Sequence, residues 1–330
     1  MPQDRRPDPL QPLRQGAALF DLSGRVTLFL EGAEAAGFLQ GLVTNDVLRL
    51  GPGEGCDALF LTPKGKLRAT ATVLRLPQGL LLDTPPELRS RLPEILRDYL
   101  PFHPGVRLSD ETGATVVLHL AGPRAGDVAA AAGAPDLPRS PAGHAEAALG
   151  GDAVRVVRAD RTGEPGWDVR CGPTSFAAVL SRLETHGAVT LPPEALDAAR
   201  VEAGLPWWGR ELGEDVLPDE AGLTRTAVSY TKGCYVGQET VARLRTYGHV
   251  NRRLVGLLLD SGASAAPGDE VRAPEGRVGS VTSATLSARL GRSVALAYVR
   301  REHAGPGTRL AVAGAAGESP ATVTPFPIAG

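Results

Sequence analysis

Alternation of apolar and polar residues predicts an opening half in which short strands are interrupted by helices. Strands are predicted over residues 19–22, 25–30, 58–62, 67–76, 80–82 and 116–120. Apolar positions at helical spacing predict helices over residues 31–41 and 86–99. The strands over 58–62 and 67–76 lie on either side of Pro63-Lys64-Gly65-Lys66, which indicates a hairpin.

The middle of the chain continues with strands and helices in irregular order. Strands are predicted over residues 154–157 and 167–169, and helices over residues 129–132, 174–186 and 194–203. Pro193 opens the last helix and Gly204 lies just past its end, the two positions where these residue types are favoured. This order, with hairpins among the helices, favours an α+β architecture over a regular βαβ array.

The pattern changes near Val250, where helical periodicity gives way to short strands and Gly/Pro/Asp turns. Strands are predicted over residues 254–259, 278–282, 294–299 and 308–312. Such spacing is typical of a small all-β barrel or sandwich. We therefore expect a flexible segment over 1–16, an α+β region over 17–249 and a β domain over 250–330.

Composition excludes several classes of protein. A chain of 330 residues exceeds one hydrophobic core, and its formal charge of −2 argues against non-specific coating of nucleic acid. No run approaches the ~18 apolar residues of a membrane span, and the N-terminus lacks the apolar stretch of a signal peptide. The three cysteines are far apart and form no CxxC site, which predicts a reducing, cytoplasmic location and no metal centre. The glycines at 51–55 lack the spacing of a dinucleotide site.

Polar chemistry is densest in the octapeptide KGCYVGQE, residues 232–239. Two glycines around Cys234 and Tyr235 suggest a tight loop that enters a helix at Gln238. A thiol near Lys232 and a helix start is a setting that favours the thiolate. The alternative interpretation is an ordinary turn in which Cys234 is a small buried hydrophobe.

A second group of candidates follows the helix that ends at Gly204. Trp207 and Trp208 offer flat apolar surfaces with N–H donors. Glu202 lies near the end of that helix, where the macrodipole favours cations instead. A carboxylate at such a position either serves a partner or is simply an exposed charge.

Three motifs together resemble one family. They are R-x-E-x-G-L-P-x-x-G-x-E-L at residues 200–212, PDEAGL at 218–223 and KGCYVGQE at 232–239. With RVTL at 25–28, FLQGLVTNDV at 38–47 and LTPKGKL at 61–67, they resemble the YgfZ-type folate-binding proteins, relatives of the glycine-cleavage T-protein. The resemblance runs from about residue 18 to the end of the chain.

The resemblance implies a three-lobed fold. Two ferredoxin-like α+β lobes would exchange segments, and a C-terminal antiparallel β-barrel would complete a central cavity for tetrahydrofolate. It implies that Glu202 accepts from the pterin and that Trp207, Trp208 and Tyr235 cover the ring. Further contacts are expected from Asn45, Gln238 and Arg243.

One departure from the family bears on activity. Aminomethyltransferases carry an acidic Asp after the glycine hairpin, whereas residues 65–73 here, GKLRATATV, contain no carboxylate. Loss of an acid/base group typically costs ~10²–10⁴-fold in rate, so we expect no aminomethyltransferase activity. Asp46 and Asp57 are possible replacements, although turn or cap roles suit them better.

Three functions therefore stand as hypotheses. The first, implied by the resemblance, is a cytoplasmic tetrahydrofolate-binding accessory protein. Its partners would be iron–sulfur proteins or their assembly machinery, with a weak or indirect link to tRNA modification and none to a membrane. The second is a folate-dependent one-carbon transferase or demethylase that uses Cys234, with Lys232 beside it. The third is an RNA- or protein-binding module that uses the basic stretch 225–253.

Overall fold

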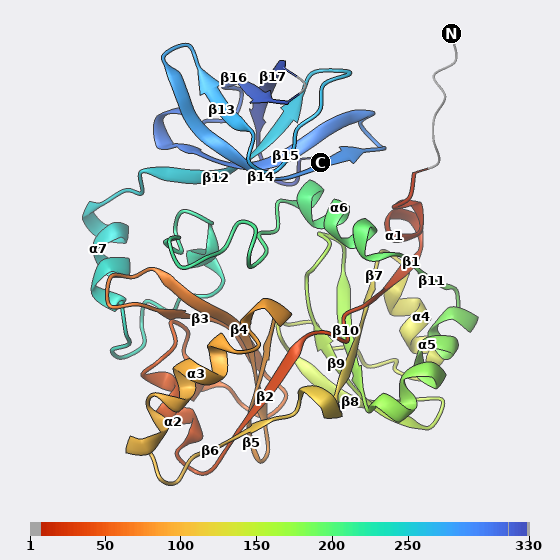
Figure 1. Ribbon diagram of the computed structural model, residues 1–330. Coiled ribbons are helices and arrows are strands. Elements are labelled where there is room, and N and C mark those ends of the chain that lie inside the picture. Colours follow the sequence, from red (N-terminus) through yellow and green to blue (C-terminus); the bar gives the residue numbers. More distant parts are fainter. Residues whose placement is uncertain (1–7, 316, 329–330) are drawn as a thin grey trace.

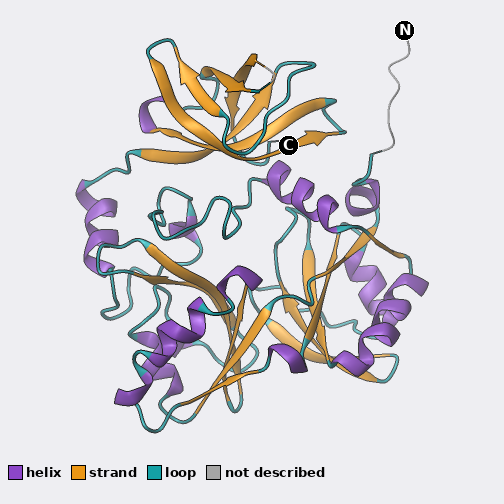
Figure 2. Cartoon of the chain, in the orientation of Figure 1, coloured by secondary structure: helices purple, strands orange, loops and turns teal. Residues whose placement is uncertain are grey.

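The structure, a computed structural model, describes residues 8–315 and 317–328. Two β-sheets lie side by side beneath a β-barrel (Figure 1), and most helices flank the outer sides of the sheets (Figure 2). The predicted fold class is confirmed: mixed α+β sheets with a closed, six-stranded antiparallel barrel at the C-terminal end.

The first sheet has five antiparallel strands in the order β3-β4-β5-β2-β6. Its strands are β2 (Val26–Glu31), β3 (Gly55–Leu61), β4 (Leu67–Leu76), β5 (Gly79–Thr84) and β6 (Arg107–Asp110). Helices α2 (Ala35–Gln40) and α3 (Arg91–Arg97) pack on it, since Phe38, Leu92 and Ile95 share one core with its strands. In β4, alternate residues from Leu67 to Val73 are buried, so the intervening threonines face the other way.

The second sheet has six strands in the order β11-β1-β7-β10-β9-β8. Its strands are β1 (Ala17–Asp21), β7 (Val116–Ala121), β8 (His144–Leu149), β9 (Asp152–Arg158), β10 (Gly166–Cys171) and β11 (Ala188–Thr190). Helices α4 (Ala125–Ala132) and α5 (Phe176–Thr185) cover it. The chain thus begins in this sheet with β1, crosses to the other sheet for β2 to β6, and returns with β7. Adjacent stretches of sequence therefore contribute to both sheets.

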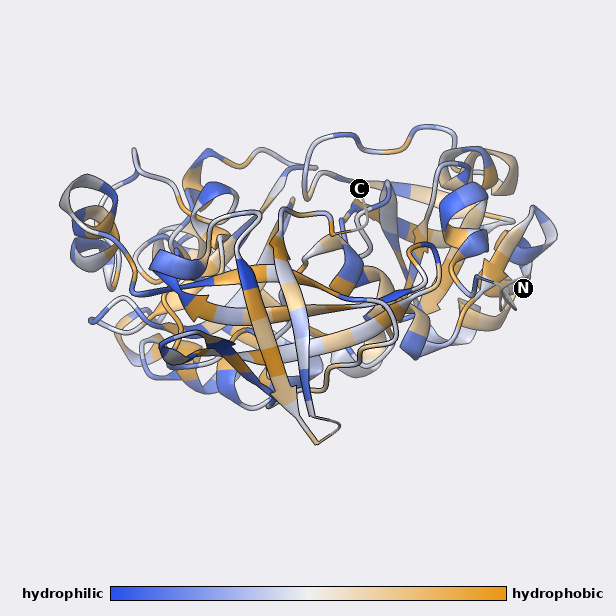
Figure 3. Cartoon of the chain, turned by 90° about the horizontal axis from the view of Figure 1, so that it is seen from above, coloured by the Kyte–Doolittle hydropathy of each residue, from blue (hydrophilic) through white to orange (hydrophobic). Residues whose placement is uncertain are grey.

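The barrel closes in the order β12-β15-β14-β13-β16-β17. Its strands are β12 (Arg252–Leu259), β13 (Glu270–Ala273), β14 (Gly276–Ser287), β15 (Arg292–Arg300), β16 (Arg309–Gly314) and β17 (Gly317–Thr324). Seen from above, the strands mix hydrophobic and hydrophilic residues along their length (Figure 3). This pattern suits walls with one face on a core and the other in solvent.

Two helices connect the sheets to the barrel. Helix α6 (Pro193–Ala203) packs between β1 and strands β14 and β15, and α7 (Gln238–Tyr247) precedes β12. Helix α6 ends where Gly204 adopts φ 78°, a left-handed conformation that glycine accepts at little cost. The chain then turns into the segment 205–227, which runs between the sheets and the barrel.

The N-terminal segment differs from the flexible stretch expected over 1–16. Helix α1 (Gln11–Gln15) lies within it, and both Leu10 and Leu13 are buried in a cluster with Phe20 and Leu196. That burial orders the segment, although residues 1–7 lie outside the described range. The helix expected over 86–99 is also shorter, since it begins as a 3₁₀ turn at Pro86–Leu88 and becomes α-helical only over Arg91–Arg97.

Candidate ligand-binding cavity

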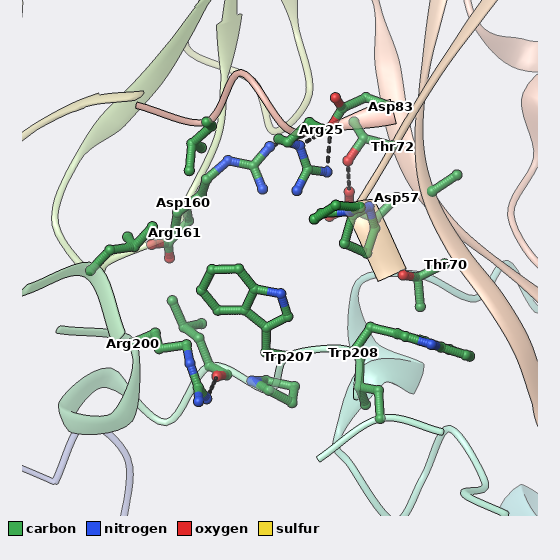
Figure 4. A pocket seen from close by; sticks show the side chains of 18 of the residues that line it. Arg25, Asp57, Thr70, Thr72, Asp83, Asp160, Arg161, Arg200, Trp207 and Trp208 are labelled. Atoms are coloured by element: carbon green, nitrogen blue, oxygen red, sulfur yellow. Dashed lines mark hydrogen bonds and ion pairs between the residues drawn. The ribbon is translucent and has the colours of Figure 1, made fainter. Parts of the chain in front are cut away.

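A cavity of about 450 Å³ lies where the two sheets meet the segment 205–227. Its walls come from strand β3 and β4 residues, from the loops after β1 and β9, and from helix α6. The polar and aromatic residues that line this cavity are Phe20, Asp21, Arg25, Asp57, Thr70, Thr72, Asp83, Asp160, Arg161, Arg200, Trp207, Trp208 and Thr226. Figure 4 labels most of them. Its volume lies within the range of small-molecule sites, about 300–1,000 Å³.

The two predicted tryptophans both line this cavity. A buried ionic cluster holds Trp207, because Arg200 Nη1 donates to Glu211 at 3.0 Å and the Trp207 backbone N–H donates to the same carboxylate at 2.9 Å. Arg200 also donates to Ser283 Oγ of the barrel at 2.8 Å, and its guanidinium lies 5.4 Å from the Trp207 ring centroid. Trp207 is therefore held by a cluster of side chains that joins α6 to the barrel.

One wall of the cavity carries guanidinium groups that are already paired. Asp83 accepts from Arg25 Nε at 2.8 Å and from Arg170 Nη1 at 2.7 Å. Arg161 Nε donates to both oxygens of Asp168, at 2.9 and 3.1 Å. Since Asp83 belongs to the first sheet and Arg170 to the second, this network joins the two sheets.

The network sets the protonation of its carboxylates. Burial by itself would raise the pKa of Asp83, but the guanidiniums of Arg25, Arg170 and Arg161 outweigh burial and lower that pKa. In Asp168, burial is likewise overcome, by Arg161 and by the His119 hydrogen bond, so its pKa lies well below the usual range. Both carboxylates stay ionised and occupied by arginines, and neither is free to exchange a proton with a ligand.

The opposite wall is formed by β3 and β4. Asp57 pairs directly with Thr72 across the two strands, and Leu59 pairs with Thr70. Thr72 Oγ1 donates to Asp57 Oδ1 at 2.7 Å, and the side chain of Asp57 is exposed at the cavity (Figure 4). The expected turn or cap role of Asp57 is therefore wrong, because the residue lies in mid-strand. Its carboxylate has no arginine partner within ion-pair distance in the described chain.

Glu202, the predicted acceptor for a pterin, lies outside this cavity. Its carboxylate pairs with Arg14 of α1 and lines a separate hollow of about 130 Å³. The cause is helical geometry, since residues two apart on a helix point about 200° apart. Arg200 takes the side of α6 that faces the cavity and the barrel, so Glu202 faces α1.

Lys232 is a structural residue in this geometry. Its ammonium is buried and donates to the carbonyl oxygens of Gln40, Val43 and Asn45 at 2.7, 2.6 and 2.8 Å. Burial lowers the pKa of Lys232 to about 8. All three N–H groups are thus committed to the loop after α2, and Lys232 does not line the cavity.

The rest of the octapeptide packs against the β3–β4 turn. A Cβ on Gly237 would lie 2.6 Å from the Thr62 carbonyl oxygen, and φ there is 85°. Tyr235 is buried beside Lys232, whose Nζ is 5.3 Å from the ring centroid, and burial raises the Tyr235 pKa to about 12. Cys234 is an exposed free thiol with no hydrogen-bond partner among the described residues. Neither side chain lines the cavity.

The other predicted contacts also lie elsewhere. Asn45 Nδ2 donates to the Asp57 carbonyl at 2.8 Å and to the Thr226 carbonyl at 3.3 Å, so it braces the cavity wall from behind. Gln238 begins α7, and Arg243 is exposed on the same helix. Asp46 does fit a turn role, since it accepts from Gln40 and Arg49 beside a short 3₁₀ helix.

Sequence reasoning missed Arg161, Asp83 and the two threonines as cavity residues, and it considered Asp57 only as a less favoured replacement for the missing acid. A signal existed for Asp83, because a carboxylate that ends the apolar run Leu80-Leu81-Leu82 must be paired if it is buried. No local sequence pattern indicates that Asp57 faces the cavity, because this position depends on how β3 pairs with β4.

Among the described residues, no His, Cys, Asp or Glu side chains converge in a group of three that could hold a metal. None of the helices in the described part of the chain is long and apolar enough to span a membrane.

Two sheets that enclose a cavity together with the segment 205–227, and a closed barrel packed above them, define the class of T-protein-like folds. Residues 8–232 match the GCVT N-terminal domain and residues 252–328 match the glycine cleavage T-protein C-terminal barrel domain, so the chain belongs to this GCVT family.

Relatives of several names share this family. The chain is 29% identical over 310 residues to "Putative transferase At1g60990, chloroplastic" of Arabidopsis thaliana, covering 94% of this chain and 71% of the relative. It is 33% identical over 299 residues to an aminomethyltransferase of Rubrobacter xylanophilus, covering 89% and 78%. The crystal structure of aminomethyltransferase T from Bartonella henselae superimposes with a TM-score of 0.84 at 23% identity, covering 97% and 88%, which shows the shared fold.

Proposed function

We propose that this protein binds a reduced folate in the cavity between its two sheets and acts as an accessory protein to iron–sulfur enzymes. The observation that carries the folate half is the pairing of two indoles, Trp207 and Trp208, with an opposite wall of acceptors. Indoles offer stacking surfaces for a pterin, whose 2-amino and N3–H groups need acceptors in the same plane.

The cavity supplies those acceptors at Asp57, Thr70 and Thr72 rather than at Glu202. The Asp57 carboxylate keeps acceptor capacity beyond its bond from Thr72. The guanidiniums of Arg25 and Arg161 line the far side, where Asp83 and Asp168 already neutralise them. The residues present therefore fit tetrahydrofolate, the cofactor of T-protein relatives.

The proposed accessory role toward iron–sulfur enzymes is supported by the sequence. KGCYVGQE supports the YgfZ-type branch, and the cavity face of β4 carries hydroxyls where aminomethyltransferases carry a carboxylate. In this proposal the partners are iron–sulfur proteins or their assembly machinery, with tRNA modification affected through them, and the location is cytoplasmic. Its test is the activity of iron–sulfur enzymes in a strain that lacks the gene, restored by the wild-type chain. Unchanged enzyme activities in that strain would refute this half.

Tryptophan fluorescence tests the folate half. The chain has three tryptophans, and the third, Trp167, donates to the Pro138 carbonyl at 2.9 Å outside the cavity. Tetrahydrofolate should quench the wild-type emission saturably, and Trp207→Phe and Trp208→Phe should each reduce that change while Trp167→Phe retains it. No saturable change in the wild type, confirmed by calorimetry, would exclude folate as the ligand.

One observation favours a second function, a one-carbon transferase. Asp57 faces the cavity without an arginine partner, so it could exchange a proton with an amine substrate held there. Cys234, which the sequence suggests for such a reaction, does not line this cavity. Turnover of a methylated amine in the presence of tetrahydrofolate, lost in Asp57→Asn but kept in Cys234→Ala, would establish this alternative.

A further inference from the structure

A second hollow of about 470 Å³ lies between α7, the segment 218–230 and the start of β12. Its charged and aromatic lining consists of Asp219, Arg225, Tyr230, Arg245, His249 and Arg253. Val228 and Val241 are buried beneath these side chains and form an apolar floor. We call this hollow the arginine pocket.

The arginines of this pocket are placed for a ligand rather than for internal ion pairs. Arg225 and Arg245 are exposed, and neither has a carboxylate within ion-pair distance among the described residues. Arg253 reaches Asp219 only at 3.8 Å, and that carboxylate also accepts from Thr224 at 3.3 Å. Three guanidiniums thus face a single carboxylate, which leaves a net positive charge in a concave site.

Other basic residues of the stretch 225–253 do not join them. Lys232 is turned inward to three carbonyls, and Arg252 is held by Asp215 at 2.8 Å and Glu220 at 3.2 Å. Arg243 is exposed on α7 but does not line the pocket. The basic stretch is therefore not a uniform charged surface but a single pocket with three arginines.

An aromatic platform completes the pocket. Tyr230 is 38% exposed, and the Arg245 guanidinium lies 3.9 Å from its ring centroid. The guanidinium thus covers one face of the Tyr230 ring, and such pairs of arginine and aromatic ring are surfaces on which nucleobases stack in single-stranded nucleic-acid sites. The planar guanidinium groups of the neighbouring arginines present paired N–H donors that bind the oxygens of a phosphate.

We propose that the arginine pocket binds a nucleotide, with its phosphate on Arg225 and Arg253 and its base stacked on the Tyr230–Arg245 pair. The nucleotide is either free or part of a single strand, since both present the same phosphate and base. The chain's formal charge of −2 disfavours general polyanion binding, so affinity must come from this local site.

The pocket is separate from the folate cavity but shares a wall with it. Leu223, Thr226 and Ala227 line the folate cavity, while Thr224, Arg225 and Val228 line the arginine pocket. One short segment thus presents different side chains to the two sites. The nucleotide proposal does not depend on folate binding and can be tested without folate.

Calorimetric titration of the full chain with three probes tests the proposal. The probes are AMP, inorganic phosphate and a ten-residue single-stranded oligoadenylate, at low salt. AMP should bind saturably and more tightly than phosphate. If the oligoadenylate binds much more tightly than AMP, the natural ligand is a nucleotide within a single strand. If the two bind with equal affinity, the natural ligand is a free nucleotide. No saturable binding of AMP or oligoadenylate, or AMP no tighter than phosphate, would overturn the proposal.

Two arginines of α7 give a matched pair of variants. Arg245→Gln should weaken nucleotide binding about tenfold or more, because it loses a charge and the stacked plane. Arg243→Gln removes the same charge from the same helix outside the pocket and should change the affinity less than about twofold. An equal loss of nucleotide affinity in the two variants would mean that binding depends on general charge attraction, and it would refute the proposed site. Both side chains are exposed, and circular dichroism confirms folding.

Discussion

Asp57 of β3 lies directly opposite Thr72 of β4, and the threonine hydroxyl donates to its carboxylate at 2.7 Å. This pair places a carboxylate on the cavity although β4 itself contains none. The acid that the sequence of β4 lacks is therefore available from the neighbouring strand.

Replacing Asp57 by Asn should weaken tetrahydrofolate binding by about 10- to 100-fold. A hydrogen bond to a charged group contributes about 1.5–3 kcal/mol, and tenfold in affinity corresponds to about 1.4 kcal/mol. Calorimetry measures the effect. Glu239→Gln, which neutralises an exposed acid of the octapeptide outside the cavity, serves as the control and should bind like the wild type. Wild-type affinity in the Asp57 variant would show that this carboxylate does not contact the ligand.

Replacing Lys232 by Met should lower the free energy of unfolding by roughly 3 kcal/mol. The variant leaves the carbonyls of Gln40, Val43 and Asn45 without their donor, and an unsatisfied buried polar group costs about 1–3 kcal/mol. Urea unfolding measures the change. Lys64→Met, at an exposed position in the β3–β4 turn, should have little effect. A catalytic but not structural Lys232 would give the opposite outcome, with stability kept and activity lost.

Stability should fall in acid because of the network around Asp83 and Asp168. Their pKa values are lowered in the folded chain, whereas an unfolded Asp titrates near ~3.9. The unfolded chain therefore takes up more protons as pH falls, so the stabilisation is complete above about pH 5 and is lost below about pH 4. Unfolding curves between pH 6 and about pH 3 measure this slope.

Asp83→Asn should flatten that slope, because it removes one of the two carboxylates. Asp98→Asn is the matched control, since the Asp98 side chain is 59% exposed and lies 3.9 Å from Arg68. An identical acid slope in both variants would assign the pH dependence to other groups.

A thiol reagent should modify Cys234 well before the other two cysteines. Cys234 is exposed, Cys171 is buried, and burial raises the pKa of the half-buried Cys56 to about 12. Ellman titration of the native chain should show one fast thiol, and the denatured chain should show all three. The fast phase should vanish in Cys234→Ser. Its persistence there would mean that Cys56 is open to solvent.

Local periodicity and turn residues predicted most strands and helices but missed β6, β8, β11, β13 and β17. They left the C-terminal domain as a barrel or a sandwich, and the family resemblance indicated the barrel. The sequence also identified Trp207 and Trp208, whose adjacency stands out in a chain with three tryptophans. The resemblance pointed to Glu202 rather than Arg200 as a residue of the cavity. Which of the two faces the cavity is decided by the barrel that packs against α6. Such a choice requires tertiary contacts.

The polar walls of the cavity could not be predicted from the sequence for a related reason. Asp57 meets Thr72 only through the β3–β4 register, which contains an irregularity at Phe60 and Leu61. Arg25 and Arg170 meet at Asp83 because the chain leaves the second sheet after β1 and returns with β7. Long-range pairing of this kind leaves no trace in local sequence.

The Lys232 contacts have a consequence for how relatives are sorted. Through these bonds and the Gly237 contact with Thr62, the octapeptide, the loop after α2 and the β3–β4 turn form one packed corner of the molecule. A motif search with KGCYVGQE thus selects proteins that assemble this corner, not proteins that share a reaction. Two relatives with identical octapeptides could differ at positions 57, 70 and 72 and so differ in chemistry. Inspection of those three positions is the more direct guide to activity.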